Sequence, residues 1–287
     1  MAEAKVGIIG GSGLYKLEGM TKVRAVKLKT PFGDPSDAFI LGDIAGVQVA
    51  FLPRHGIGHR ISPTELPSRA NIYAMKSLGV ERIISVNAVG SLKEKVKPLD
   101  AVIPDQIIDR TNGRISTFFT GGLVAHVAFA DPFCPVLSSV LYEAAKKAGI
   151  GVHDGGIYIA MEGPQFSTRA ESELYRSWGA DVIGMTILPE AKLAREAEIC
   201  YASISFVTDY DCWNEIYDQV TTDMIIANLQ KNVDVAKKIL RLLIDHLPQT
   251  RDCICANALQ NALVTSPKHI TGQLKKDLKL IIGKYIK

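Results

Sequence analysis

Short apolar runs alternate with longer amphipathic segments along most of the chain. The short runs are rich in valine and isoleucine and end at glycine, proline or aspartate, as β-strands do. Because several of them are apolar almost throughout, we expect a sheet that is covered on both faces. The predicted strands are Val6–Gly10, Ala38–Ile44, Val47–Leu52, Arg82–Val86, Ala101–Pro104 and Ala202–Val207. The second and third of these are joined near Gly46 and predict a hairpin, so the sheet is expected to be mixed.

The amphipathic segments predict helices over residues 66–78, 135–148, 168–178, 187–198 and 223–246. In the last segment, apolar residues from Ile225 to Leu240 recur at helical spacing, and Thr222 with Asp223 offers a helix start. Alternation of strands and helices indicates an α/β fold. No linker rich in proline, glycine and serine divides the chain. We therefore expect a single domain with a mixed central β-sheet flanked by helices.

Composition and charge exclude several classes of protein. Hydrophobic residues make up 47% and charged residues 22% of the 287 residues, which is the usage of an ordinary globular protein. No apolar run approaches the roughly 20 residues that a bilayer span needs, and the first residues lack the basic and apolar regions of a signal peptide. The formal net charge is only +3. We expect a cytoplasmic protein with no nucleic-acid partner and no membrane partner.

A glycine-rich loop follows the first predicted strand. Glycines at 10, 11 and 13 let backbone N–H groups converge on an anion, and Ser12 adds a hydroxyl donor. A dinucleotide-binding fingerprint fits poorly, because Lys16 stands at its third glycine position. The ordinary alternative is a structural turn.

Two further strand ends carry groups that suit an anion. Arg54 and His55 follow the strand at 47–52, and an arginine can give a phosphate two parallel hydrogen bonds. The segment 87–91 ends another strand, at the edge where open α/β sheets gather ligands. Taken singly, a surface arginine and a packed histidine are the ordinary alternatives.

An aromatic ring and a carboxylate pair complete the candidate chemistry. Phe166 lies in an unusual turn sequence and could stack on a heterocyclic base, although a single phenylalanine usually packs in the core. Asp209 and Asp211 follow an apolar strand and would point to the same side of an extended chain. Close carboxylates raise the pKa of one of them, so that it can stay protonated and donate. A solvated acidic turn is the alternative. Together these features predict a site for an anion and a heterocycle.

With these motifs the sequence resembles a purine nucleoside phosphorylase of the 5′-methylthioadenosine phosphorylase family, over roughly residues 5–264. The segments that carry the resemblance are Gly7–Leu14, Thr30–Asp37, Arg54–Gly56, Glu162–Ser167, Gly184–Thr186 and Thr208–Trp213. The resemblance implies a trimer or a hexamer built as a dimer of trimers. It also implies a site that is partly completed by a neighbouring subunit.

The resemblance also assigns roles to individual residues. Phosphate would be bound by Ser12, Arg54, His55, Asn87, Ala88 and Thr186. The nucleoside would be bound by Phe166, Met185, Asp209, Tyr210, Asp211, Thr222, Ile225 and, from the adjacent subunit, His126. Three positions depart from the expected pattern, namely Asn87, Gln165 and Thr222. The last lies near the 5′ substituent and puts a strict preference for 5′-methylthio substrates in doubt.

The implied reaction is the phosphorolysis of 5′-methylthioadenosine, and of adenosine, in purine and methionine salvage. Asp209 would be the general acid that protonates N7 of the leaving adenine. Inorganic phosphate would be a co-substrate, with no metal or organic cofactor. A phosphorylase of broad purine specificity and a nucleoside-binding module without catalysis are the alternatives.

The end of the chain differs from the family-like region. Residues 265–287 hold six lysines and one acid, and Leu274, Leu278, Ile281, Ile282 and Tyr285 recur at helical spacing. We divide the chain into a phosphorylase domain, 1–264, and a basic amphipathic tail, 265–287. Such a helix can lie on a membrane or on a partner, but we expect its apolar face to pack on protein.

The five cysteines contain no pair of CxxC motifs, so spacing does not indicate a structural zinc site. Thermophilic archaeal relatives look similar around Cys253-Ile254-Cys255, with internal disulfides. That resemblance implies disulfides Cys134–Cys200 and Cys253–Cys255, with Cys212 free. Five reduced cysteines are the alternative for a cytoplasmic enzyme.

Overall fold

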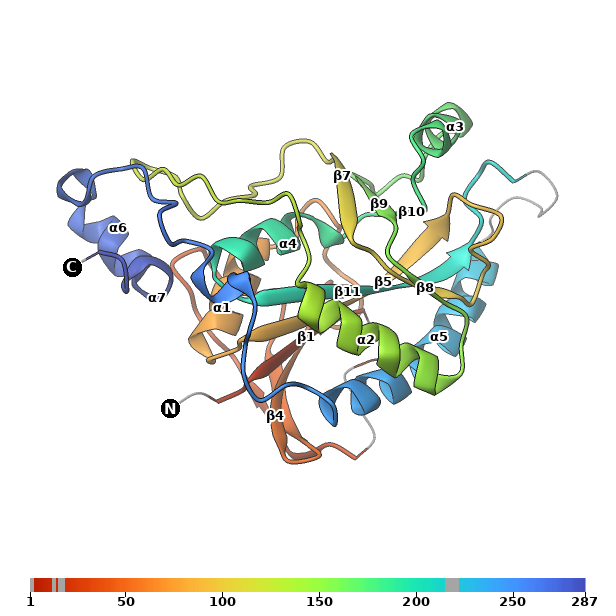
Figure 1. The fold of residues 1–287 in the computed structure, drawn as a ribbon, viewed down its shortest axis with the longest axis horizontal. Coiled ribbons are helices and arrows are strands. Elements are labelled where there is room, and N and C mark those ends of the chain that lie inside the picture. The colour runs from red at the N-terminus through yellow and green to blue at the C-terminus, as the bar shows by residue number, and fades with distance from the viewer. Residues whose placement is uncertain (1–2, 12–13, 15–18, 215–221, 287) are drawn as a thin grey trace.

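One mixed sheet runs through the molecule and collects all the strands in the described part of the chain (Figure 1). The computed structural model describes residues 3–11, 14, 19–214 and 222–286, with the side chains of 222–227 left aside. The strands are β1 Val6–Gly10, β2 Thr21–Val26, β3 Phe39–Ile44, β4 Val47–Pro53, β5 Arg82–Ser91, β6 Ala101–Ile103, β7 Gln106–Arg110, β8 Val152–Asp154, β9 Ile157–Met161, β10 Val182–Gly184 and β11 Cys200–Asp209. The main path is β2-β3-β4-β1-β5-β10-β9-β7, and β11, β6 and β8 branch from β5.

The branch at β5 creates the edge where the candidate site lies. The first residues of β5 lie between β1 and β11, which both run parallel to it. Its last residues continue beyond β1 and pair antiparallel with β10. Because β4 is also parallel to β1, the carboxyl ends of β4, β5 and β11 meet at one edge. Arg54 follows the end of β4, Asn87 lies in the second half of β5 and Asp209 ends β11, so the three residues lie near this edge although they are far apart in sequence.

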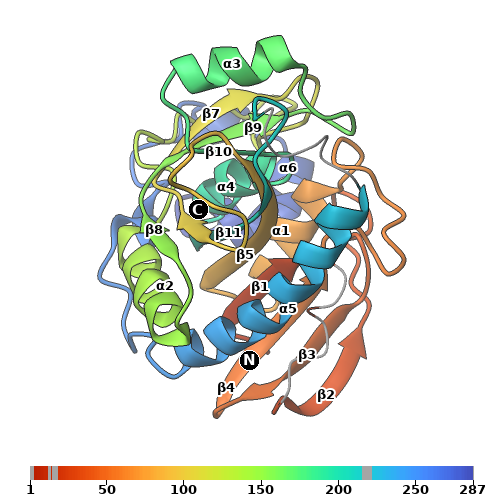
Figure 2. The same ribbon diagram turned by 90° about the vertical axis from the view of Figure 1, so that its right-hand side faces the viewer.

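Helices cover both faces of the sheet, as the apolar strands predict (Figure 2). The helices are α1 Ser68–Ser77, α2 Pro135–Ala148, α3 Arg169–Ser177, α4 Ile187–Glu196 and α5 Thr222–Ile244. Helices α1 and α4 pack together on one face, and α2 and α5 pack together on the other. Successive strand residues alternate between the two layers: Ile9 joins the core under α1 and α4, and Ile8 joins the core under α2 and α5.

The predicted α/β class, mixed sheet and hairpin are confirmed. The five predicted helices are present, and α2 spans the predicted residues, 135–148. Strands β5 and β11 are longer than predicted, because they continue through polar residues into the site. Strand β2 and strands β7–β10 were not predicted. The first is largely exposed, with no apolar alternation, and β8 and β10 have only three residues each.

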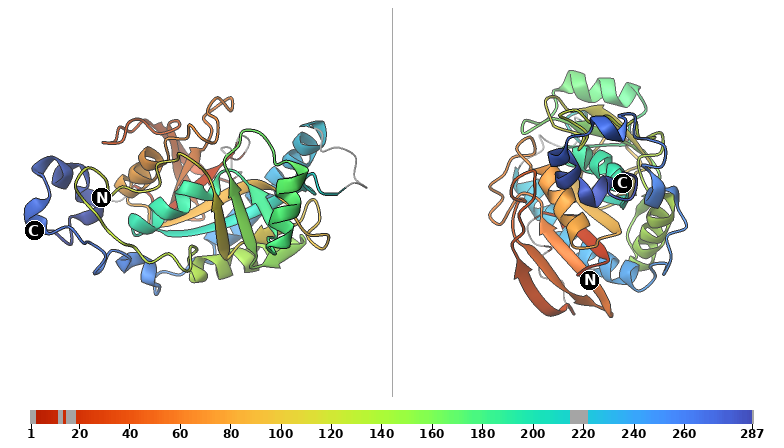
Figure 3. Two further views of the ribbon diagram at one scale, coloured as in Figure 1. Left: turned by 90° about the horizontal axis from the view of Figure 1, so that it is seen from above. Right: turned by 90° about the vertical axis from the view of Figure 1, so that its left-hand side faces the viewer.

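The tail packs on its own chain, at the end of the molecule remote from the carboxyl end of β11 (Figure 3). It forms two short helices, α6 Gly272–Asp277 and α7 Lys279–Ile282, instead of one continuous helix. Its apolar residues Ile270, Leu278, Ile281 and Ile282 are buried in the layer that contains α1 and α4. In the described part of the chain, no helix has the length and apolar content to cross a membrane.

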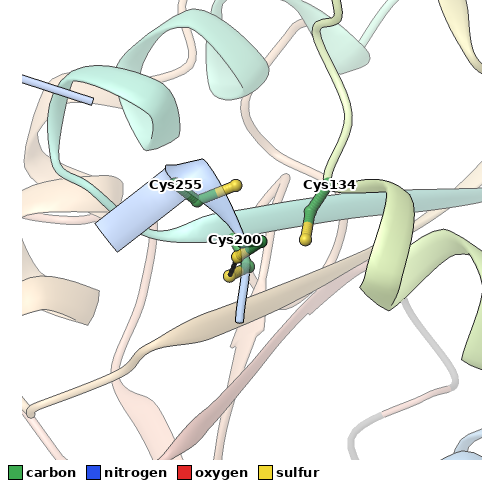
Figure 4. A group of neighbouring side chains, drawn as sticks. Cys134, Cys200 and Cys255 are labelled. Atoms are coloured by element: carbon green, nitrogen blue, oxygen red, sulfur yellow. Dashed lines mark hydrogen bonds between the residues drawn. The ribbon is translucent and has the colours of Figure 1, made fainter. Parts of the chain in front are cut away.

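The predicted disulfides Cys134–Cys200 and Cys253–Cys255 are wrong for this structure, in which all five cysteines are free thiols. The sulfur of Cys200 instead lies 3.3 Å from that of Cys253, a separation larger than the roughly 2.05 Å of a disulfide bond. The thiols of Cys134 and Cys255 face the same space (Figure 4). Four sulfurs thus share one cluster, and they are not arranged as two bonded pairs.

Candidate active site

A cavity of about 800 Å³ opens at the sheet edge described above. Strand ends form its floor, and α5 and the loop after β9 form its walls. The predicted site residues that line it are Arg54, His55, Asn87, Ala88, Phe166, Met185, Thr186, Asp209 and Asp211. The fold therefore brings together both the expected anion-binding groups and the expected base-binding groups.

Asp209 is the titratable group best suited to proton donation. Its side chain is 7% exposed at the end of β11. Thr208 Oγ1 donates to Asp209 Oδ2 at 2.7 Å, and the backbone N–H of Asp211 donates to Oδ1 at 2.9 Å. Burial raises the pKa of Asp209 to about 6; the bond from Thr208 lowers it and the charge of Asp211 raises it. The sequence argument stressed the neighbouring carboxylate, but burial is the larger cause.

Asp211 is held in place by two serine hydroxyls. Ser167 Oγ lies 2.9 Å from both of its carboxylate oxygens, and Ser172 Oγ donates to Oδ2 at 2.6 Å. The backbone at Asp211 has φ of +33°, a region that aspartate tolerates better than most residues. Asp211 is therefore an oriented hydrogen-bond acceptor at the wall of the cavity.

The anion-binding side is built around a buried ion pair that the sequence did not predict. Arg54 Nε donates to Glu190 Oε1 at 2.6 Å, and both side chains are at most 2% exposed. Further Arg54 donors reach Ser85 Oγ at 2.6 Å and the carbonyl of Val86 at 3.0 Å. Arg54 thus uses most of its donors inside the protein. Arg54 also lines the cavity, but most of its hydrogen bonds hold β4 against β5 and α4.

Thr186 and Asn87 lie side by side at the cavity. Thr186 Oγ1 donates to Asn87 Oδ1 at 2.8 Å, and Asn87 Nδ2 donates to Ser203 Oγ at 2.7 Å. Ala88 follows with an exposed side chain that lines the cavity. The hydroxyl, the amide and the nearby backbone supply neutral groups that can reorganise around an anion.

His55 is electrically neutral in this environment. Its Nδ1 lies 2.9 Å from the carbonyl of Ile61. Its ring stacks on His59 with 4.3 Å between centroids. Burial, and next the charge of Arg54, lower the pKa of His55 to about 4. Because Nδ1–H donates to Ile61, Nε2 is left as an acceptor.

Phe166 and Met185 lie where a base and a sugar could contact apolar surface. Phe166 is 67% exposed at the cavity wall in the single chain. Arg114 fixes the backbone of Met185, because its Nη1 donates to the Met185 carbonyl at 2.6 Å. Gly163 has φ of +69°, and a Cβ there would lie 2.4 Å from Met185 Sδ. A side-chain-free residue at 163 therefore makes room for Met185.

Two predicted residues do not line this cavity. The hydroxyl of Tyr210 donates to the Glu94 carbonyl at 3.3 Å, and its ring packs edge-on against Trp213. His126 is exposed, and its backbone N–H donates to the Ala262 carbonyl at 2.9 Å. Ser12 and the side chains of Thr222 and Ile225 lie outside the described residues.

Sequence reasoning missed the residues that orient the site. Glu190, Ser167 and Ser172 hold Arg54 or Asp211, and Arg114 holds Met185. The sequence could have indicated the role of Glu190, because an acidic residue on the buried side of an amphipathic helix needs a positively charged partner. Arg114 lies in an irregular segment with no periodicity, so its role depends on tertiary structure alone.

The fold and the site are those of a nucleoside-cleaving phosphorylase. The family model described as "Phosphorylase superfamily" matches residues 5–245, and the chain belongs to this family. The chain is 58% identical over 285 residues to the S-methyl-5′-thioadenosine phosphorylase of Geobacter sulfurreducens, covering 99% of this chain and 100% of the relative. It is 57% identical over 283 residues to the enzyme of the same name from Koribacter versatilis, covering 99% and 97%.

Solved structures give the same result. A methylthioadenosine phosphorylase from an antarctic soil metagenomic library has a TM-score of 0.94 at 50% identity, covering 98% of this chain and 99% of that chain. The Schistosoma mansoni methylthioadenosine phosphorylase in complex with adenine has a TM-score of 0.82 at 34% identity, covering 98% of each chain. The phosphorylase fold predicted from the sequence motifs is confirmed.

Proposed function

We propose that this protein catalyses the phosphorolysis of 5′-methylthioadenosine, and of adenosine, to adenine and the corresponding ribose 1-phosphate. The observation that carries the proposal is Asp209, a buried carboxyl with a raised pKa that faces a cavity beside anion-binding groups. The names of the relatives at 58% and 57% identity support the choice of substrate.

The reaction needs orientation and one proton. Phosphate bound near Asn87, Ala88 and Thr186 attacks C1′ of the ribose as the bond from C1′ to N9 breaks. The electron pair of that bond goes to the purine, and protonated Asp209 donates its proton to N7. Holding two reactants in line can lower the barrier by roughly 7–11 kcal/mol. The step uses no redox chemistry and no covalent enzyme intermediate, so we propose no cofactor besides the phosphate co-substrate.

The base preference follows from the carboxylate pair. The side-chain oxygens of Asp211 accept hydrogen bonds from Ser167 and Ser172 and suit the 6-amino group of adenine, whereas the 6-oxo group of hypoxanthine would face them as a second acceptor. A site built to pair with a polar group can reject an analogue that cannot pair by about 10⁴–10⁵. This favours a 6-aminopurine phosphorylase over one of broad purine specificity.

One assay separates the three candidate functions. Adenine or hypoxanthine release is measured from methylthioadenosine, adenosine and inosine, with and without phosphate. We expect phosphate-dependent release from the first two. Equal rates with inosine would support broad specificity, and binding without release would support a nucleoside-binding module.

The Asp209→Asn variant tests the proposed acid in the same assay. An amide cannot protonate N7, so we expect turnover of adenosine to fall by at least the 10²-fold typical of a lost general acid. Because the amide NH₂ can face a 6-oxo group, the ratio of inosine to adenosine turnover should rise. Near-normal turnover of adenosine would exclude Asp209 as the acid.

Three further features belong to the proposal. We infer a homotrimer or a homohexamer from the resemblance to the phosphorylase family, and the exposure of Phe166 at the site of a single chain leaves surface there that a neighbouring subunit can cover. Light scattering in solution tests this, and a monomer with full activity would contradict it. A role in purine and methionine salvage follows from the proposed products. The cytoplasmic location stays a prediction.

A further inference from the structure

Four cysteine thiols converge at the end of β11 that is remote from the proposed active site. The sulfurs of Cys134, Cys200, Cys253 and Cys255 all lie within 4.8 Å of one another. Figure 4 shows the labelled side chains of Cys134, Cys200 and Cys255 directed toward one space between α2, β11 and the turn Ile254–Asn257. Three of the four residues are at most 2% exposed.

The separations fit a single tetrahedral ion. Sulfurs bound to zinc at about 2.3 Å lie roughly 3.8 Å apart in a tetrahedron. In the cluster, the Cys200 and Cys253 sulfurs lie 3.3 Å apart and no two of the four sulfurs lie more than 4.8 Å apart, so the separations lie around that value. A set of four thiolates is typical of closed structural zinc sites. In the described residues, it is the one group of side chains whose ligand atoms converge in this way.

The segment that carries the two ligands of the CxC pair is anchored before and after them. Buried Arg82, which lies opposite Cys200 on β5, donates to the carbonyls of Pro248 at 2.9 Å and Thr250 at 2.7 Å. Arg251 Nη1 donates to the Glu198 carbonyl at 3.0 Å, and the N–H of Leu259 donates to Glu198 Oε1 at 3.0 Å. The approach of Cys253 and Cys255 to the other two thiols is thus imposed by the fold.

Two features beside the cluster favour negative charge on its sulfurs. Cys134 is the residue that caps the N-terminus of α2, where the helix dipole stabilises negative charge. Arg82 adds a buried positive charge on the strand next to Cys200. Metal binding would require all four thiols to release their protons.

We propose that Cys134, Cys200, Cys253 and Cys255 form a structural site for one Zn²⁺ ion per chain. The ion joins the start of α2, the start of β11 and the segment between α5 and the tail. It has no part in the proposed reaction, because the length of β11 places it roughly 30 Å from Asp209. The ligands come from three segments separated by 66 and 53 residues, so motif spacing gave no sign of the site.

The test measures metal and thiols in the same sample. The full-length protein is purified anaerobically from zinc-supplemented cells without chelator, and its metal content is determined by elemental mass spectrometry. Thiols are titrated after denaturation in chelator without reductant. We expect about one zinc per chain and five thiols. A protein without zinc overturns the proposal. If it has five free thiols, the cysteines simply pack as side chains, and if it has fewer, some of them form disulfides.

Matched variants assign the ligands. Cys255→Ser should lose most of the zinc, whereas Cys212→Ser, which removes a cysteine outside the cluster, should keep it. Full zinc in the Cys255→Ser variant would overturn the ligand set. If that variant fails to fold, cobalt exchanged into the wild-type protein decides the question. Intense visible bands and sulfur-to-cobalt charge transfer are expected, and their absence contradicts a tetrathiolate site.

Discussion

Thr208 sets how acidic Asp209 is. Its hydroxyl donates to Asp209 Oδ2 at 2.7 Å and holds the pKa below the value that burial alone would give. If protonated Asp209 is the acid, kcat/KM for methylthioadenosine is constant below its pKa, near 6, and falls as pH rises through that value.

Thr208→Val should move this decline to higher pH. The variant keeps the branched shape but removes the donor, so the pKa of Asp209 should rise by roughly one to two units, since hydrogen bonds to charged groups are worth ~1.5–3 kcal/mol. The measurement is kcat/KM against pH for both proteins. The titration of phosphate affects the two profiles equally, so the difference between them reports the pKa of Asp209. Superimposable profiles would exclude the Thr208 hydrogen bond as a determinant of that pKa.

Arg54 is a structural residue as well as a candidate phosphate ligand. Arg54→Ala leaves Glu190 buried without its cation, and breaking a buried pair costs about 3–5 kcal/mol of unfolding free energy. Adding Glu190→Gln should recover part of that loss, because the orphaned charge is gone. Urea unfolding of both variants measures this. Equal stability of the single and double variants would show that Glu190 without its partner does not destabilise the fold.

The loss of Arg54 should also affect phosphate. In the double variant Arg54→Ala/Glu190→Gln, we expect the KM for phosphate to rise more than the KM for the nucleoside. An unchanged phosphate KM would restrict Arg54 to its structural role.

At the scale of the element, the loop after β9 positions Met185 through a glycine. Gly163→Ala places a Cβ 2.4 Å from Met185 Sδ at a positive φ, so both the loop and Met185 must shift. We expect a several-fold rise in the KM for the nucleoside, with a smaller effect on phosphate. Gly149→Ala is the matched control, because Gly149 has φ of +84° with open space around its Cβ position. It should cost stability without changing KM, and equal KM values in the two variants would refute the positioning role.

At the scale of the whole molecule, the tail completes the core. Ile281 is 2% exposed and its neighbour Leu280 is 44% exposed. Lys284 and Tyr285 also bind the carboxylate of Glu198, at 2.6 and 2.5 Å. The tail therefore belongs to the same folded unit as residues 1–264. The division at residue 264 marks a change in amino-acid composition, but the two parts pack together.

Ile281→Ala should lower the unfolding free energy by about 2–5 kcal/mol, as for other large-to-small core substitutions. Leu280→Ala, one residue away and on the exposed side, should change it little. Thermal and denaturant unfolding provide the comparison. If the two variants are equally stable, the tail does not pack on the core in solution.

The sequence by itself determined the elements whose pattern is local. Helix α2 was predicted at its observed ends, because apolar spacing, Pro135 and Gly149 all act within one segment. The phosphorylase motifs also identified nine of the residues that line the cavity, since a motif combines many local constraints. Strand β2, in contrast, has no apolar alternation to reveal it.

Only the tertiary structure decided which distant groups meet. It paired Arg54 with Glu190, 136 residues away, and directed Tyr210 away from the cavity although it lies between two cavity residues. It also gathered four cysteines into one cluster in place of two bonded pairs. Such contacts depend on sheet order and helix packing, which bring together side chains with no shared local pattern. Hydrophobic periodicity records which face of an element is buried, but it does not record which partner that face will meet.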